Sequence, residues 1–328
     1  MKMAAGILLL ISIGSLVAVA MALIFGGPSR PSAMQDINAP FRAVDYRDLP
    51  KLSHYPVRDG SQLAYRRYPP VSDTAKGSVV LLHGSAGNST TLHSLAKAHA
   101  EAGFMTYALD VRGHGASGTK GDIDYIGQLE DDLEDFLAAI DPVRPSTLVG
   151  FSSGGGFALR VAGSRRQQLF DHYLLLAPFV SQDAPTHRPD SGGWTSVGLL
   201  RYITLALLNR LGIDAFNHLP VMHYALNDDA ASSLTPVYSF NLAQNYRPKP
   251  DYRATLKAVD CPMRVLVGQD DQIFRAEQFE PVFQEAGRDV PVRRLTGIDH
   301  IGLILDTGAI EAIVAETQAL NTRGSCQR

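Results

Sequence analysis

What the 328-residue sequence has little of already excludes several classes of protein. Lysine and arginine form no basic run and the net charge is −3, so the basic face that nucleic-acid binding requires is missing. Cysteine occurs only twice, at Cys261 and Cys326, in no metal-binding pattern. Two cysteines are too few for a disulfide scaffold. A single disulfide between them is not excluded, although the sequence gives no reason to expect one. We therefore expect neither a nucleic-acid partner nor a metal.

Charge is absent from one long stretch at the N-terminus. No charged residue occurs between Lys2 and Arg30, and residues 3–25 are almost wholly apolar. A membrane-spanning helix needs about 20 such residues, whereas the core of a signal peptide has about 7–15. Residues 20–22 (AMA) have the small-x-small form of a cleavage site, but the apolar run continues past them. The length favours an uncleaved anchor over a cleaved signal, with residues 1–30 as anchor and linker.

An anchor of this kind also predicts where the rest of the chain lies. Lys2 and the amino terminus favour the cytoplasmic side for the N-terminal end, while Arg30 argues in the opposite direction. We expect the catalytic domain outside the cytoplasm, which is the periplasmic side in a bacterium.

Apolar strands alternate with helices over residues 50–328, and this order predicts an α/β fold. After an extended pair that turns at Asp59 and Gly60, strands are expected at residues 78–83, 104–110, 146–151, 172–176, 263–268 and 290–295. Helices are expected at residues 91–102, 126–140, 155–163, 276–286 and 310–320. An insert at residues 178–254 interrupts the order. Such alternation predicts a mostly parallel sheet with helices on both faces, and sites at the carboxyl ends of its strands.

The strongest motif lies between a predicted strand and a predicted helix. Residues 150–154 read GFSSG, which is the Gly-x-Ser-x-Gly pattern of a nucleophile elbow. The serine of such an elbow lies in a strained turn, and the flanking glycines let neighbouring backbone approach closely. Ser152 is therefore the predicted nucleophile, and Ser153 is not at the elbow position. The alternative, a glycine-rich turn with two ordinary serines, does not explain the strand–turn–helix context.

A serine nucleophile needs a base and an acid that orients the base, and this motif's partners follow in the order Ser, Asp or Glu, His. Asp270 and Asp271 follow the predicted strand at residues 263–268. His300 follows the last predicted strand and is the only histidine after His223. The base is therefore nearly determined once Ser152 is accepted.

These motifs resemble the α/β-hydrolase superfamily, and within it the branch of monoacylglycerol-lipase-like and serine-aminopeptidase-like hydrolases. In that family the acid follows a glycine in a Gly-x-x-Asp pattern, which points to Asp271 in GQDDQI at residues 268–273. The segment HGSAG at residues 83–87 resembles the family's oxyanion-hole segment. The resemblance implies that the backbone N–H groups of Ser85 and Ser153 hold the oxyanion.

The resemblance further implies roles for two other segments. Residues 110–118 (DVRGHGASG) resemble a loop of the family that we interpret as scaffold, so His114 is not the expected base, and His83 is structural. Inserts at this position cover the pocket in that family. We therefore expect the apolar run at residues 194–211 to belong to a lid, although it would equally suit a small core of the insert.

The predicted function is hydrolysis of a carboxylic ester, such as a monoacylglycerol or lysophospholipid, through an acyl-enzyme and without a cofactor. An amide or peptide hydrolase of aminopeptidase type is the alternative, and it would need an acidic pair such as Asp228 and Asp229. A catalytically silent scaffold that binds a ligand or partner would lack one member of the catalytic set. His218 and His223 lack a third ligand at metal spacing.

Overall fold

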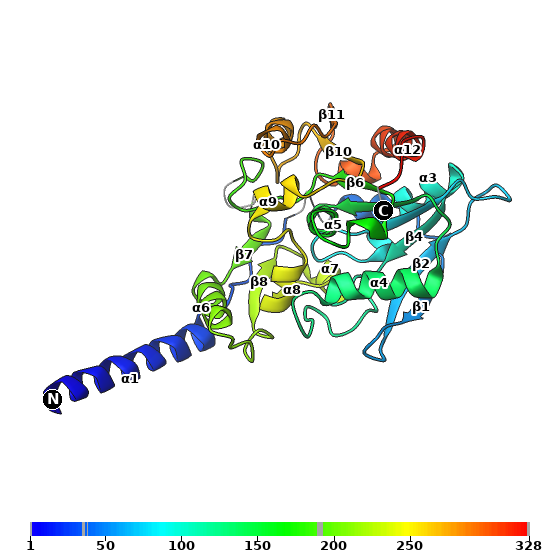
Figure 1. Ribbon diagram of the computed structural model, residues 1–328. Coiled ribbons are helices and arrows are strands. Elements are labelled where there is room, and N and C mark those ends of the chain that lie inside the picture. Colours follow the sequence, from blue (N-terminus) through cyan, green and yellow to red (C-terminus); the bar gives the residue numbers. More distant parts are fainter. Residues whose placement is uncertain (1, 35–36, 38, 189–192, 327–328) are drawn as a thin grey trace.

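A computed structural model describes residues 2–34, 37, 39–188 and 193–326, without the side chains of residues 2–12. An eight-stranded sheet forms the centre of the molecule, in the order β1-β2-β4-β3-β5-β6-β10-β11 (Figure 1). Its strands are β1 (Leu52–Pro56), β2 (Gln62–Tyr68), β3 (Ser78–Leu82), β4 (Met105–Leu109), β5 (Ser146–Phe151), β6 (His172–Leu176), β10 (Met263–Gly268) and β11 (Val292–Leu295). The strands from β4 to β11 pair in parallel, whereas β2 is antiparallel to both β1 and β4.

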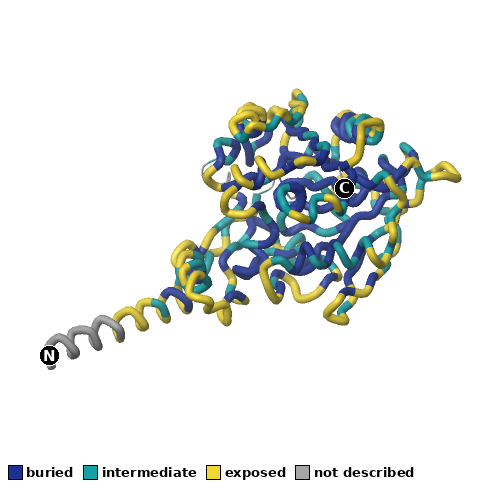
Figure 2. The backbone as a smooth tube through the Cα atoms, viewed as in Figure 1, coloured by how far each residue is buried: buried dark blue, intermediate teal, exposed yellow. Residues whose placement is uncertain are grey.

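The sheet confirms the predicted α/β-hydrolase architecture. Every residue of β3, β5 and β6 is buried (Figure 2), as expected for strands covered on both faces. The predicted extended pair is the β1–β2 hairpin, and Gly60 in its turn has a φ of +84°.

Helices cover both faces of this sheet. On one face, α3 (His93–Glu101) packs against α12 (Thr307–Asn321). On the other lie α4 (Gln128–Ile140) and α5 (Ser153–Ala162), which an ion pair between Glu130 and Arg160 joins. The right-handed crossover from β3 to β4 places α3 on one face of the sheet. The next crossover runs from β4 back across β3 to β5, and so it places α4 on the opposite face. Because these strands are parallel, the carboxyl ends of β3, β5, β10 and β11 lie at the same end of the sheet.

The predicted insert lies between β6 and β10 and has a small sheet of its own. It contains β7 (Thr195–Val197), α6 (Leu199–Arg210), β8 (Pro220–Tyr224), α7 (Asp228–Ser233), β9 (Val237–Ser239), α8 (Phe240–Asn245) and α9 (Tyr252–Lys257). Strands β7, β8 and β9 pair antiparallel. These strands were not predicted, because they are short and carry no clear alternation of apolar and polar residues.

The N-terminal residues form helix α1 (Lys2–Phe25), which extends away from the domain and packs against α6 near its C-terminal end (Figure 1). Within the described part of the chain, no helix is both long and apolar enough to span a membrane. About half of the predicted anchor, residues 1–12, lies outside the described side chains. The anchor at residues 3–25 is thus not found and stays a prediction.

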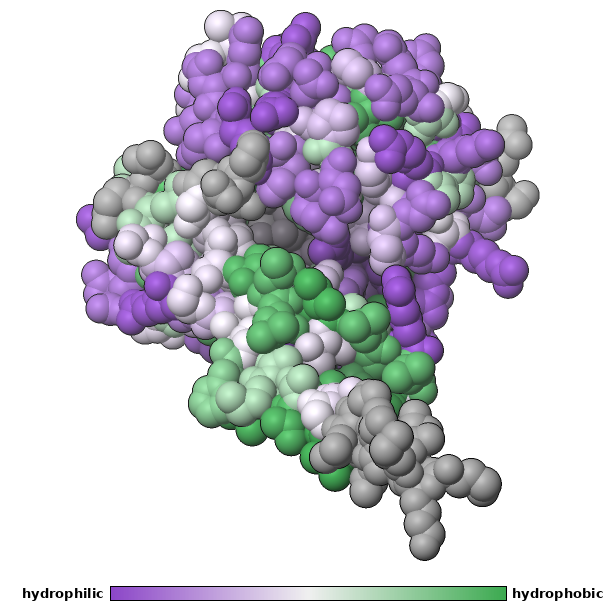
Figure 3. Space-filling view, turned by 90° about the vertical axis from the view of Figure 1, so that its left-hand side faces the viewer, coloured by the Kyte–Doolittle hydropathy of each residue, from purple (hydrophilic) through white to green (hydrophobic). Residues whose placement is uncertain are grey.

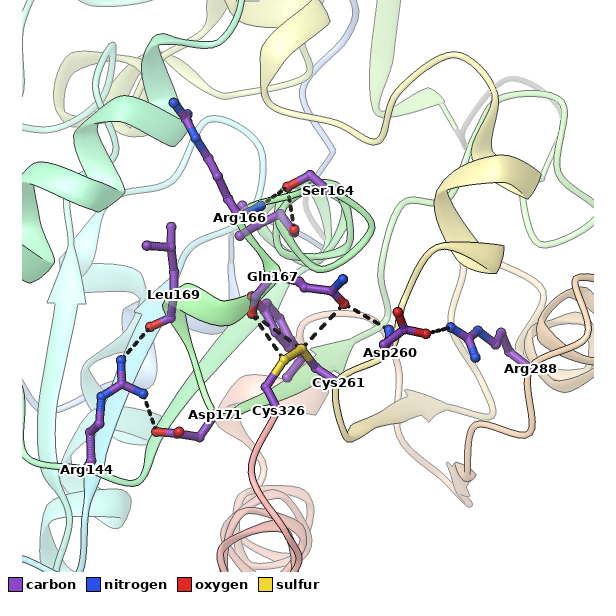
Figure 4. Close-up of a disulfide and its surroundings, with 12 residues drawn as sticks. Arg144, Ser164, Arg166, Gln167, Leu169, Asp171, Asp260, Cys261, Arg288 and Cys326 are labelled. Carbon is purple, nitrogen blue, oxygen red and sulfur yellow. Dashed lines mark hydrogen bonds and ion pairs between the residues drawn. A yellow bond between two sulfur atoms is a disulfide. The ribbon is translucent and has the colours of Figure 1, made fainter. Parts of the chain in front are cut away.

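The two cysteines form a disulfide, a bond that was left open on the sequence alone (Figure 4). Cys261 lies just before β10, as expected for a small buried residue at the start of a strand, and Cys326 lies in the C-terminal tail. The N–H of Cys326 donates to the carbonyl oxygen of Asp171 at 3.2 Å, and this hydrogen bond helps to hold the C-terminal tail beside Cys261. The bond connects segments 65 residues apart in sequence.

Candidate active site

Ser152 lies in the sharp turn between β5 and α5. Its φ of +54° is rare for a residue other than glycine. The N–H of Ser152 donates to the carbonyl oxygen of Leu176 in β6 at 2.9 Å, which helps to hold this conformation. A Cβ atom on Gly150 would lie 2.3 Å from the carbonyl oxygen of Gly154, and one on Gly154 would lie 2.4 Å from that of His83. Only glycine therefore permits the close packing that raises Ser152 at the edge of the sheet.

A series of hydrogen bonds links Ser152, His300 and Asp271. Nε2 of His300 lies 3.1 Å from Oγ of Ser152, and Nδ1 lies 2.7 Å from Oδ2 of Asp271. The other carboxylate oxygen of Asp271 accepts the N–H groups of Ile273 at 2.7 Å and Phe274 at 2.8 Å. The relative exposures of Ser152, Asp271 and His300 are only 7%, 1% and 4%. The carboxylate favours the tautomer with its proton on Nδ1, so Nε2 is left to accept a proton from the serine.

The structure also separates the two candidate acids. Asp271 is buried and faces His300, whereas the adjacent Asp270 is exposed. The N–H of Asp270 donates to the carbonyl oxygen of Ile298 at 3.0 Å. Among the two, only Asp271 can orient the imidazole.

The two predicted oxyanion residues lie beside each other next to Ser152. The hydroxyl oxygens of Ser85 and Ser153 are 2.6 Å apart, which brings the loop after β3 against the start of α5. Within the described residues, neither backbone N–H has a hydrogen-bond acceptor. Two uncommitted N–H groups beside a nucleophile suit the stabilisation of an oxyanion.

Tyr238, which comes from β9 of the insert, supports this loop. Its hydroxyl accepts the N–H of Ala86, the residue after Ser85, at 2.7 Å. It also lies 2.5 Å from Nε2 of His114. Nδ1 of His114 lies 3.2 Å from the carbonyl oxygen of Val111, so that nitrogen carries the proton and Nε2 accepts from Tyr238. Tyr238 was not predicted as a site residue, because no local pattern relates an insert residue to the loop after β3.

His83 and His114 are structural, as the sequence analysis expected, rather than bases. Burial lowers the pKa of His83 to about 4, and it lowers the pKa of His114 well below its usual value. Nδ1 of His83 lies 2.9 Å from the carbonyl oxygen of Gly84, and Nε2 accepts the N–H of Val111 at 3.2 Å. Both rings therefore stay neutral and brace the loops after β3 and β4.

The loop after β4 serves as scaffold. Arg112 forms ion pairs with Asp132 at 2.7 Å and with Asp59 at 2.8 Å. Burial raises the pKa of Asp132 to about 6, against the opposing effect of Arg112. Asp110 accepts the N–H of Ser89 at 2.7 Å, so that its carboxylate joins this loop to the segment after β3.

Two cavities meet at the catalytic serine and share Ser85, Ser152 and Trp194. The first has a volume of about 360 Å³, and its other lining residues include Ile37, Phe41, Leu226, Asp229, Leu234, His300 and Ile304. The second, of about 280 Å³, is lined by residues that include Ser153, Phe179, Gln182, His187, Val197, Leu199, Tyr202, Tyr224, Arg247 and Phe274. Both linings are mainly apolar, so this site suits a substrate with an apolar part on each side of the reacting carbonyl.

No group of three or more metal-ligating side chains occurs in the described part of the chain. His218 and His223 accordingly have no third ligand beside them there. The donors that converge on the site are a hydroxyl, an imidazole, a carboxylate and backbone N–H groups, which together suit acyl transfer.

The chain is similar to a family of known proteins and to individual members of known function. The family described as serine aminopeptidase, S33, matches residues 73–303. A monoacylglycerol lipase of Mycolicibacterium smegmatis is 35% identical over 128 residues, which cover 37% of this chain and 44% of that enzyme. The chain thus matches less than half the length of this relative.

Two further relatives align over most of the chain. A thermostable monoacylglycerol lipase of a Bacillus species is 26% identical over 76% of this chain and 90% of that enzyme. A soluble variant of monoglyceride lipase from Saccharomyces cerevisiae, solved with a substrate analogue, superposes with a TM-score of 0.62. It is 18% identical, over 87% of this chain and 99% of that one, and so supports the fold.

Proposed function

The chain belongs to the serine aminopeptidase S33 family, in the monoacylglycerol-lipase-like branch of the α/β-hydrolases, and we propose that it cleaves carboxylic esters with Ser152 as nucleophile. The observation that carries this proposal is the bonded series of Ser152, His300 and Asp271 at the junction of two apolar cavities. A catalytically silent scaffold would not require these hydrogen-bonded side chains beside two backbone N–H groups that have no acceptor among the described residues.

The reaction proceeds in two steps. Oγ of Ser152 attacks the ester carbonyl while Nε2 of His300 takes its proton, and Asp271 stabilises the imidazolium that forms. The N–H groups of Ser85 and Ser153 bind the oxyanion. His300 then donates the proton to the leaving alcohol, and an acyl-enzyme remains. Water, activated by His300, releases the acid and restores Ser152.

The substrate class follows from the cavities and the relatives. Both cavities are mainly apolar, and two relatives are monoacylglycerol lipases. We therefore propose a monoacyl lipid or a similar long-chain ester as the substrate. The insert, which supplies Trp194, Leu226 and Leu199 to the cavity walls, acts as a lid that excludes water.

The test compares the chain with its Ser152→Ala variant. Both are treated with a fluorophosphonate label and assayed on p-nitrophenyl esters and monoacylglycerols of increasing chain length. The parent is expected to label and turn over, and the variant to lose about 10⁴-fold or more in kcat, as loss of a triad nucleophile does. A folded parent that neither labels nor turns over would favour the silent scaffold.

One observation keeps amide hydrolysis as a second candidate. Asp229, one of the two acidic residues considered for binding a substrate amine, lines the same cavity as Ser152. Its neighbour Asp228 is instead in an ion pair with Arg30. Aminoacyl p-nitroanilides distinguish the candidates, because an aminopeptidase would cleave them and would lose this activity in Asp229→Asn.

We also propose that the protein associates with membranes through an apolar surface formed by α1 and α6. Figure 3 shows an apolar patch on this side of the molecule. Its exposed members are Leu16, Val17, Met21, Ile24 and Phe25 of α1 and Leu199, Leu200, Ile203 and Leu207 of α6. Arg201 joins the two helices, since it donates to the carbonyl oxygens of Leu23 at 2.8 Å and Ile24 at 2.9 Å. Apolar patches of this kind mark interaction sites.

Vesicle sedimentation tests this association. The double variant Leu200→Glu with Leu207→Glu is expected to bind phosphatidylglycerol vesicles more weakly than the parent, whereas Val71→Glu, at an exposed apolar residue outside the patch, is the control. Equal binding by the double variant would contradict the assignment of this surface.

The disulfide supports a location outside the cytoplasm. Bonds such as Cys261–Cys326 persist in oxidising compartments and are rare in the reducing cytoplasm. Alkylation of the native protein, isolated without reductant, is expected to label neither cysteine. Two labelled thiols would argue against this location.

A further inference from the structure

One end of the second cavity differs from its otherwise apolar lining. Gln182, His187 and Arg247 lie close together there, and the wall of the same cavity also includes Ser152 and Ser153. A charged group in the wall of an apolar catalytic cavity loses hydration, and this loss needs compensation. The partners of Arg247 therefore indicate what this end of the cavity is built to bind.

Arg247 has only neutral partners among the described residues. Its guanidinium lies over the ring of Phe179, 5.2 Å from the centroid. One nitrogen donates to the hydroxyl of Tyr202 at 3.3 Å, and another donates to Oε1 of Gln182. A guanidinium carries five N–H donors in a planar fork, so most of them remain for a ligand.

Arg247 is half-buried, and arginines that are more buried differ in their partners: Arg201 donates to backbone carbonyl oxygens, whereas two others have carboxylates. Arg112 forms an ion pair with Asp132, and Arg160 forms one with Glu130. Within the described part of the chain, no carboxylate lies within ion-pair distance of Arg247. Its positive charge is thus left to act on the cavity.

Neighbouring charges make this end of the cavity positive. Burial lowers the pKa of His187, and the positive charges of Arg247 and Arg275 lower it further. Arg275 therefore lies near the same end of the cavity as Arg247 and His187. Asp183 raises the pKa of His187. Among the described residues that act on His187, two arginines stand against one aspartate, and this balance favours an anion.

We infer that the Arg247 end of the second cavity is an anion subsite, and that the ester cleaved at Ser152 carries a phosphate or carboxylate on the side that enters this cavity. The inference rests on the proposed ester hydrolysis. Oxygen atoms of either anion match the donor fork of the guanidinium. An apolar stretch of substrate between the ester and the anion would contact Phe179 and Tyr224.

The kinetic test uses esters that share one acyl length and differ in charge. Decanoylglycerol is neutral, decanoylglycerol phosphate carries its anion on the alcohol side, and the glyceryl monoester of a dicarboxylic acid carries it at the end of the acyl chain. The parent is expected to prefer one of the two anionic esters, which identifies the side that enters the cavity. Preference for the neutral ester would overturn the inference.

Substitutions then assign the preference to Arg247. Arg247→Gln is expected to lower the ratio of kcat/KM for the anionic over the neutral ester by about 10- to 100-fold, as loss of a hydrogen bond to a charged group does. Arg247→Lys, which keeps the charge without the fork, is expected to lose less. The matched control is Arg253→Gln, because Arg253 also lies over an aromatic ring, 4.8 Å from the Tyr252 centroid, but is exposed and lines neither cavity. An equal loss on all esters would indicate a structural role and overturn the inference.

Binding to the Ser152→Ala variant separates this inference from the proposed hydrolysis. Trp194 is the only tryptophan and lines both cavities, so its fluorescence reports ligand entry. Decyl phosphate and decanoate, below their micellar concentrations, are expected to bind more tightly than decylglycerol, and Arg247→Gln is expected to abolish the difference. No such difference would refute the subsite even if esters are cleaved. A clear difference would support it even if hydrolysis fails.

Discussion

Removing the hydroxyl of Tyr238 tests whether the insert helps to build the oxyanion hole. In Tyr238→Phe, the N–H of Ala86 loses its acceptor at 2.7 Å, and Nε2 of His114 loses its donor at 2.5 Å. Ala86 and His114 are 0% and 1% exposed, so water does not replace the lost partner. A buried polar group without a partner costs about 1–3 kcal/mol. We expect the free energy of unfolding to fall by about that amount for each group.

The effect on catalysis follows from the position of Ala86. It directly follows Ser85 and has a φ of +62°, so the bond to Tyr238 holds a strained turn that carries one proposed oxyanion donor. Loss of a whole donor lowers the rate by about 10²–10³-fold. A donor that is displaced but not removed should cost less, and we expect kcat to fall by about 10- to 100-fold with little change in KM.

The assay measures kcat and KM on a p-nitrophenyl ester, the affinity for a boronate that mimics the tetrahedral intermediate, and unfolding in urea. Tyr173→Phe is the matched control, because the hydroxyl of Tyr173 is bonded to the carbonyl oxygen of Gln167 at 2.7 Å, away from the site. The control should lose stability but keep kcat and boronate affinity. Full kcat in Tyr238→Phe, or an equal loss of kcat in Tyr173→Phe, would refute the reasoning.

Three further predictions concern stability. Burial lowers the pKa of His99 to about 4, below its ordinary value of 6.5, so the unfolded chain takes up a proton first as pH falls. The free energy of unfolding should therefore drop by roughly 3 kcal/mol between pH 6.5 and 4 because of this group, and the same pH slope in His99→Gln would contradict its role. Replacing Cys261 and Cys326 by serine should cost about 2–4 kcal/mol in urea unfolding while kcat/KM is kept, and an unchanged midpoint would mean that the bond does not form. A methyl group on Gly154 would lie 2.4 Å from the carbonyl oxygen of His83, so Gly154→Ala should lose about 1–3 kcal/mol and much of its kcat. Unaltered stability and kcat would show that the turn can relax.

Local pattern was sufficient to predict the central fold. Mainly apolar runs such as residues 78–82 and 146–151 became strands that are buried on both faces, because helices cover both faces of a parallel sheet. The α/β-hydrolase architecture is confirmed. Boundaries moved by a few residues, for example at β11, which is shorter than the predicted strand at residues 290–295.

The candidate catalytic residues also came from the sequence. Ser152 is specified by its own pentapeptide, and His300 is specified because it is the only histidine that follows the candidate acids Asp270 and Asp271. The structure brings both within hydrogen-bond distance of each other and selects Asp271 over Asp270 by burial. Their catalytic roles stay predictions until the Ser152→Ala comparison is made.

The sequence by itself therefore determined the order of strands and helices, the elbow and the chain order of its partners, because each of these depends on neighbouring residues or on strand ends. Only the tertiary structure decided which insert residues reach the site. Tyr238, Trp194 and Arg247 follow no periodic pattern, and they line one cavity with Ser152 although 40 or more residues of sequence separate each of them from it. The same reason explains the disulfide between Cys261 and Cys326: a bond that depends on where a tail lies against a distant strand leaves no local signal.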